Sequence, residues 1–243
     1  SAMYIIRSCV PTMTLLQHAC RILTAMPNSE TISSAAISTI SSNSTTNWQD
    51  RLSTRCLFSI APATTSTAKD FTPLWYEAFP QPANGPADFI GTTYYVDFPH
   101  LRFIVIDTNG LQALHHFTRV NTWVNKTIKE AGDRFVVVMM HHPVFSSAVG
   151  RQNPMIYLTF REPLRHADLV FAGHDHNYCR RLPFVNTNAA TKYYRPKHNT
   201  HDECSCSGHR LYEVLNIVGD TLTLQTYLLE EGTLYDYVEI IRD

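Results

Sequence analysis

Two apolar runs of the sequence, residues 136–140 and, after Asp168, residues 169–172, are each followed closely by histidines. These are His141 and His142 after the first run, and His174 and His176 after the second. A continuous apolar run is typical of a strand that is covered on both faces. Side chains at the carboxyl edge of such a sheet project into the crevice where ligands bind, and neutral imidazole is a common metal ligand. The sequence therefore predicts that His141, His174 and His176 converge on metal at this edge.

The number of ions is open at this point. In an extended segment residues i and i+2 face the same side, so His174 and His176 could share one ion. A turn led by Gly173 could instead direct them towards two adjacent ions. The competing interpretation is that each histidine is an ordinary hydrogen-bonded residue near a strand end.

The two segments, H-H-P-V-F-S and G-H-D-H-N-Y-C-R, resemble the last two signature blocks of the calcineurin-like metallophosphoesterases. The nearest branch is similar to the purple acid phosphatases, whose final block reads G-H-x-H-x-Y-x-R. The resemblance covers residues 71–243. It implies an α/β fold, a four-layer α/β/β/α sandwich of two mixed β-sheets.

The same resemblance implies a dinuclear site of two divalent or trivalent ions, Fe, Mn or Zn, that activates water against a phosphate ester. His141 and His174 would hold one ion and His176 the other. His142 and Asp175 would orient ligands rather than bind metal. The expected substrate is a small phosphate ester.

Residues 1–67 lack the ligand motifs that such a site needs. The family places D-x-H or D-x-G, G-D and G-N-H-[DE] here, yet the only acids are Glu30 and Asp50 and no glycine precedes Gly85. One interpretation is a diverged relative that kept the fold and lost the ions. The other is an out-of-frame reading: codons for Gly-Asn-His-Glu and Gly-Asp-Ile, read one base late, can give the strings at 63–66 and 36–38.

Composition limits the remaining possibilities. With 243 residues and 44% hydrophobic content, we expect one phosphoesterase domain over 1–243. A net charge of -1 supplies no excess cations for a phosphate backbone, so a nucleic-acid partner is not expected. Neither a membrane-spanning run nor a signal-peptide layout is visible, and the compartment and oligomeric state stay open.

The remaining patterns indicate the elements that carry the histidines. A hairpin is expected over 94–98 and 101–107, with Asp107 in an Asx turn, and helices over 111–131 and 154–165. His115 and His116 near the start of the first helix are interpreted as solvated. Three β-runs follow at 211–218, 221–229 and 234–241, which resemble antiparallel closing strands.

A second group of potential ligands lies in a polar loop, in the order His198, His201, Cys204, Cys206 and His209. These soft ligands could hold a structural zinc, or the loop could be an insertion with two neighbouring thiols. Three functions thus stay open: a metal-dependent phosphoesterase, an inactive scaffold of the same fold, and a zinc-binding interaction module.

Overall fold

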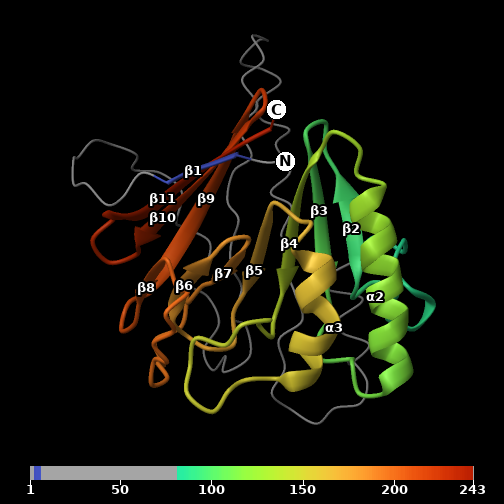
Figure 1. Cartoon of the computed structure of the whole chain (residues 1–243), viewed down its shortest axis with the longest axis horizontal. Helices are drawn as coiled ribbons and strands as arrows, with labels where there is room; N and C mark the ends of the chain where they lie inside the picture. The colour runs from blue at the N-terminus through green and yellow to red at the C-terminus, as the bar shows by residue number, and fades with distance from the viewer. Residues whose placement is uncertain (1–2, 7–80, 243) are drawn as a thin grey trace. The chain divides into compact units, whose positions relative to one another are not determined.

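The computed structural model describes residues 3–6 and 81–242 (Figure 1). The described residues divide into two compact units, one formed by 81–209 and the other by 3–6 together with 210–242. Both interpretations of residues 1–67 concern residues that, apart from 3–6, lie outside the described ranges. The single domain expected over 1–243 stays a prediction.

Within residues 81–209 the strands form a seven-stranded mixed sheet in the order β2-β3-β4-β5-β7-β6-β8 (Figure 1). They are β2 (Tyr94–Asp97), β3 (Leu101–Ile106), β4 (Phe135–Met140), β5 (Leu169–Ala172), β6 (Tyr178–Arg181), β7 (Phe184–Asn186) and β8 (Cys204–Cys206). Strands β3, β4, β5 and β7 run parallel, whereas β2, β6 and β8 are antiparallel to their neighbours. The predicted hairpin and the two buried parallel strands are therefore confirmed.

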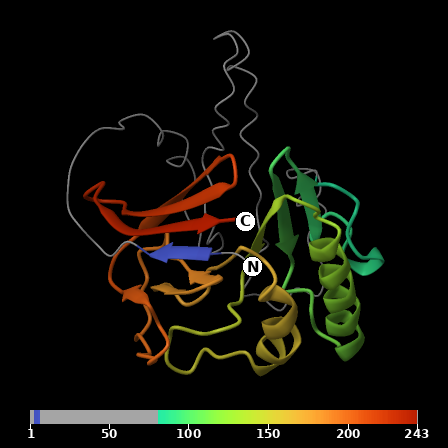
Figure 2. The same ribbon diagram turned by 45° about the horizontal axis from the view of Figure 1, so that its top comes forward.

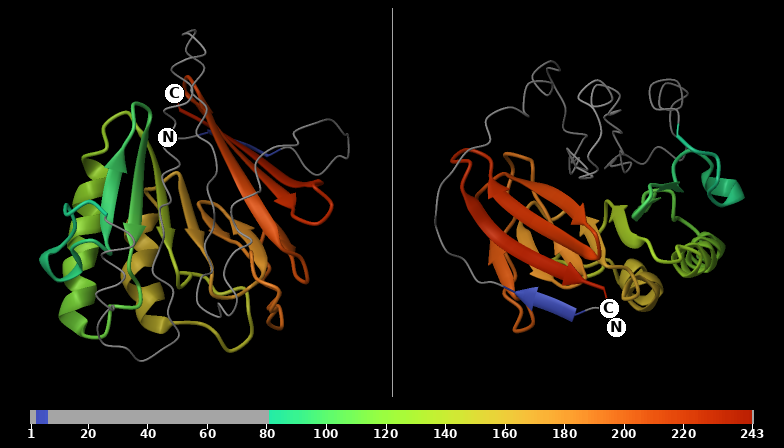
Figure 3. Two further views of the ribbon diagram at one scale, coloured as in Figure 1. Left: turned by 180° about the vertical axis from the view of Figure 1, so that it is seen from behind. Right: turned by 90° about the horizontal axis from the view of Figure 1, so that it is seen from above.

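Two helices connect the parallel strands. Helix α2 (Leu114–Lys129) joins β3 to β4, and α3 (Pro154–Leu164) joins β4 to β5; a short 3-10 turn, η2 (Ala87–Phe89), precedes β2. Helix α3 begins where the Asn153 side chain accepts a hydrogen bond from the Ile156 amide, with proline at its first position. The helices lie side by side (Figure 3), and the Asn121 side chain of α2 donates to the Thr159 carbonyl of α3 at 2.8 Å.

Apolar side chains of both helices pack against one face of the central strands. The main ones are Phe117, Val120 and Val124 of α2, Ile156, Phe160 and Leu164 of α3, and Ile104, Ile106, Val136, Val138, Met140, Val170 and Ala172 of the sheet. The alternate residues of β3, β4 and β5, including Val105, Val137 and Phe171, are buried as well. These strands are thus covered on both faces, which explains their uninterrupted apolar sequences.

The second unit contains a four-stranded antiparallel sheet in the order β1-β11-β10-β9 (Figure 2). Its strands are β1 (Met3–Ile6), β9 (Leu211–Val218), β10 (Thr221–Leu228) and β11 (Leu234–Ile241). In β10 the residues Leu222, Leu224 and Thr226 are buried and alternate with more exposed ones, as the period of two predicts. The α/β fold class with two β-sheets is confirmed.

Across residues 3–6 and 81–242, no helix combines the length and hydropathy needed to cross a lipid bilayer.

Candidate metal centre

The parallel register brings three chain segments to one edge of the seven-stranded sheet. Ile106, Met140 and Ala172, the last residues of β3, β4 and β5, are aligned across the sheet. The next residues of each strand therefore meet at the carboxyl edge. The Gly173 amide donates to the His141 carbonyl at 3.2 Å, which fixes the segment after β5 against the segment after β4.

The imidazoles of His141, His142 and His174 form a cluster at this edge. Their ring centroids are 4.5 to 5.0 Å apart, and the Nδ1 atom of His174 lies 3.2 Å from the Nε2 atom of His141. One ligand atom from each ring lies within 4.8 Å of the other two. The structure therefore brings together two of the predicted ligands, His141 and His174, and adds His142.

The family resemblance implies that His142 orients ligands rather than binding metal. Successive residues of an extended strand face opposite sides, but β4 ends at Met140, and the His141 and His142 rings lie 4.8 Å apart. The Thr108 hydroxyl lies 2.8 Å from the Nδ1 atom of His142 and also accepts a hydrogen bond from its backbone amide at 3.1 Å. Thr108 thus positions both the backbone and the ring of His142.

His176 lies outside this cluster of three. Its Nδ1 atom is 2.8 Å from the Lys192 carbonyl oxygen, and its ring lies 5.0 Å from the Tyr194 ring. His174 and His176 both have left-handed backbone conformations, with φ angles of 65° and 54°. Because neither residue is extended, the i, i+2 spacing does not place their side chains together. The role of His176 as a metal ligand stays a prediction.

The three clustered imidazoles are neutral at physiological pH. Burial, followed by the nearby His142 ring, lowers the pKa of His141 to about 3. Burial and the Arg151 charge lower the pKa of His142 to about 4, and burial and the two neighbouring rings lower that of His174 to about 2. A neutral imidazole has a free lone pair, so the cluster has the protonation state that metal binding requires.

Arg151 places a fixed positive charge beside the cluster, a feature that the sequence did not indicate. One terminal nitrogen of its guanidinium lies 2.9 Å from the His174 Nε2 atom and donates to the His174 carbonyl at 2.9 Å. The guanidinium also lies 3.8 Å above the Tyr194 ring, and its Nε atom is 3.6 Å from the Asp175 carboxylate. Arg151 is therefore held in place by several groups.

Asp175, which the resemblance implies orients a ligand, contacts the loop after β4. Its Oδ2 atom accepts hydrogen bonds from the Ser147 amide at 2.6 Å and from the Ser146 hydroxyl at 2.8 Å. Burial raises the pKa of this fully buried carboxyl, while its hydrogen bonds act in the opposite direction. Asp175 thus links the loop at 146–147 to Arg151, and so acts on the cluster indirectly.

The cluster could hold a metal ion. Two imidazole nitrogens bound to a tetrahedral Zn²⁺ at about 2.0–2.1 Å lie roughly 3.3 Å apart, close to the 3.2 Å between His174 and His141. A second ion would lack ligands here, because the described part of the chain contributes no carboxylate to this cluster. Asp107 is engaged elsewhere: its Oδ1 atom accepts from the Asn109 and Gly110 amides, which is the predicted Asx turn.

The polar loop at 198–209 does not form a ligand cluster. Cys204 and Cys206 lie on β8, and the described residues of this loop do not gather three potential ligands around one point. The interpretation as a polar insertion agrees with this arrangement, and the structural zinc site does not.

No known protein-family model matches this chain, and no curated protein matches it. Solved structures do. GAP50, described as the anchor in the inner membrane complex of Plasmodium, aligns with a TM-score of 0.52 and 15% identity, over 63% of this chain and 55% of that one. PhoD aligns with a TM-score of 0.44 and 12% identity, over 67% of this chain and 47% of that one. Vps29 from Entamoeba histolytica aligns with a TM-score of 0.30 and 12% identity, over 62% of this chain and 61% of that one. The chain thus aligns with about half to three fifths of each of these structures.

The match to GAP50 agrees with the fold described above. At 15% identity this match shows a shared α/β fold, and membership of the calcineurin-like metallophosphoesterases stays a prediction. Assignment to the purple acid phosphatase-like branch stays a prediction.

Proposed function

We propose that this protein is a metal-dependent phosphoesterase in which His141, His142 and His174 hold a metal ion, Fe, Mn or Zn. The observation that carries the proposal is the convergence of three neutral imidazoles at the carboxyl edge of the mixed sheet. A bound ion would supply a Lewis acid that activates water and polarises a phosphoryl oxygen. His176 would serve the second ion that the family resemblance implies.

Arg151 is the residue best placed to bind the phosphate group. Its guanidinium is beside His174, and its side chain is held by the Tyr194 ring and by Asp175. A planar guanidinium can form two hydrogen bonds to phosphate oxygens, and a residue fixed in advance loses little conformational freedom on binding. We therefore expect Arg151 to position the ester, while Thr108 keeps the His142 ring in place.

The proposal is tested by measuring metal content and hydrolysis of an aryl phosphate by the full chain supplied with Mn, Zn or Fe. The variant His174→Gln should lose the ion and at least about 100-fold in activity, since even residues behind the ligands contribute 10–100-fold. His166→Gln, at an exposed histidine outside the cluster, is the matched control and should change neither quantity. An active protein whose turnover survives His174→Gln would contradict the proposal.

Arg151 is tested separately through binding of the ester. Arg151→Lys keeps the charge but removes the planar fork, so KM should rise more than kcat falls. Equal loss of kcat and kcat/KM, with KM unchanged, would place Arg151 in the chemical step instead of in phosphate binding.

A second candidate function is a phosphoesterase-fold scaffold without turnover. It is supported by the contact between Arg151 and His174, which uses the Nε2 lone pair of that ring, and by the lack of a carboxylate in the described cluster. One protein of similar fold is described as an anchor, so this fold does not by itself imply catalysis. A folded protein that binds at most one ion and hydrolyses no ester with any metal would favour the scaffold.

A further inference from the structure

A second cluster of metal-binding side chains lies at the start of helix α2. It consists of His115 and His116 of the helix and Asp88 of the turn η2, and one ligand atom from each lies within 4.8 Å of the other two. The His115 and His116 rings are only 4.2 Å apart, with an angle of 64° between their planes. We propose that Asp88, His115 and His116 form a binding site for a divalent transition-metal ion.

The convergence of the two rings is unusual for neighbours on a helix. Successive helical side chains point about 100° apart around the axis, so His115 and His116 would ordinarily face different directions. Here the edge of the Phe89 ring packs against His116 at 5.3 Å and 87°, which holds that imidazole towards η2. Phe89 directly follows Asp88, so the contact also places the carboxylate beside the two rings.

The interactions around the cluster leave a ligand atom available. The Nδ1 atom of His116 is buried and has no hydrogen-bond partner among the described residues. A buried polar atom without a partner is unfavourable. Metal coordination at that nitrogen would satisfy it.

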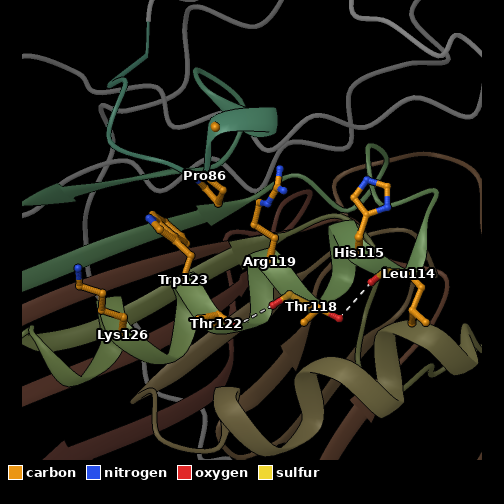
Figure 4. Close-up of a pocket in the computed structure, with 9 residues that line it drawn as sticks. Pro86, Leu114, His115, Thr118, Arg119, Thr122, Trp123 and Lys126 are labelled. Atoms are coloured by element: carbon orange, nitrogen blue, oxygen red, sulfur yellow. Dashed lines mark hydrogen bonds between the residues drawn. The ribbon is translucent and has the colours of Figure 1, made fainter.

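Arg119 competes with the metal for the carboxylate. Its guanidinium forms an ion pair with Asp88, and both side chains are substantially exposed. Figure 4 shows Arg119 and His115 on the same face of α2, beside Pro86, at the edge of an open pocket of about 900 Å³. Because an exposed ion pair contributes little free energy, an arriving cation can displace the guanidinium into the pocket.

The donor set selects the class of metal. Two imidazoles and one carboxylate suit Zn²⁺, Co²⁺, Ni²⁺ or Cu²⁺, whereas Mg²⁺ and Ca²⁺ prefer oxygen ligands. The positive end of the α2 dipole opposes a cation, but this effect is small beside three coordination bonds. With three protein ligands, the ion would keep a position for water or for a donor from a molecule in the pocket.

The test is a Zn²⁺ or Co²⁺ titration of the full chain carrying His141→Gln and His174→Gln, which removes the first centre. One ion should still bind. Asp88→Asn and His115→Gln, both at exposed residues, should each weaken it at least about tenfold, as loss of a supporting group already does. His166→Gln should leave the affinity unchanged.

The variant Arg119→Gln supplies an outcome that a nonspecific surface histidine would not give. Removing the competing cation should tighten metal binding about threefold or more, because Asp88 is then released from its ion pair. If the double variant fails to fold, the wild-type chain is titrated instead, and Asp88→Asn should weaken the binding of one of its ions at least about tenfold. Zinc affinity that is unchanged by both Asp88→Asn and His115→Gln overturns the proposal.

Discussion

The left-handed backbone of His176 leads to a prediction about stability with a definite sign. Its φ angle of 54° is one that a residue with a Cβ atom adopts at a cost of about 1–2 kcal/mol. Glycine adopts the same conformation without this cost. Replacing His176 with glycine should therefore give a more stable protein than replacing it with alanine.

The expected difference in stability between His176→Gly and His176→Ala can be worked out from the interactions that both variants lose. Both lose the imidazole, its contact with the Lys192 carbonyl and its packing on Tyr194, so these losses cancel in the comparison. Relief of backbone strain favours glycine by about 1–2 kcal/mol. The greater freedom of glycine in the unfolded chain opposes it by about 0.4–1 kcal/mol. The glycine variant should thus be more stable by about 0.5–1 kcal/mol.

The measurement is urea or thermal unfolding of His176→Gly and His176→Ala. A difference of this size corresponds to about 1–4 °C in Tm for a chain of this length. His142 is the matched control, because its φ angle is not left-handed. There the glycine variant should be the less stable one, by about 0.5–1 kcal/mol. The same sign at both positions would refute the reasoning.

Three further predictions concern single residues elsewhere. Burial and the nearby Asp202 raise the pKa of the Cys179 thiol to about 12, so about one molecule in ten thousand carries the thiolate at pH 8. Peptide mass spectrometry should therefore show that the half-exposed cysteines of β8 are alkylated before Cys179. Gly85→Ala would place a Cβ atom 1.8 Å from the Thr93 carbonyl oxygen, and urea unfolding should show a loss of about 1–3 kcal/mol. Asn153→Ala removes the cap of α3 and should lower the free energy of unfolding by about 1 kcal/mol without altering metal content.

The elements with a strong period were predictable from the sequence. The helix expected over 111–131 is Leu114–Lys129, and the β-runs at 211–218, 221–229 and 234–241 match β9, β10 and β11 to within one residue. Burial on one side imposes an apolar repeat of about 3.6 residues in the helix and 2.0 residues in the strands, and this repeat is visible in the sequence. Strands β6, β7 and β8 have only three or four residues, which is too few to show a period, so they were not predictable from the sequence.

The candidate site was predictable only where it depended on strand ends. His141 and His174 follow directly from two buried parallel strands, so the register of the sheet places them together. His142 and Arg151 join the cluster through turns that no period describes. His115 and His116 were interpreted as solvated residues near the start of a helix. The contact of His116 with Phe89, which is distant in sequence, was not predictable from the helical pattern.

The charges of the candidate metal centre link metal binding to phosphate binding. Three neutral imidazoles contribute no charge, and Arg151 and Asp175 offset each other across 3.6 Å. A divalent ion would therefore leave a net charge of about +2 in a partly buried place, which is unfavourable unless an anion accompanies it. A phosphate dianion supplies that charge and can bind Arg151 as well. Inorganic phosphate should consequently raise zinc affinity in equilibrium dialysis, and by reciprocity zinc should raise phosphate affinity by the same factor. Arg151→Gln should reduce this coupling, whereas a site that completes its charge with carboxylates of its own would show little coupling in either protein.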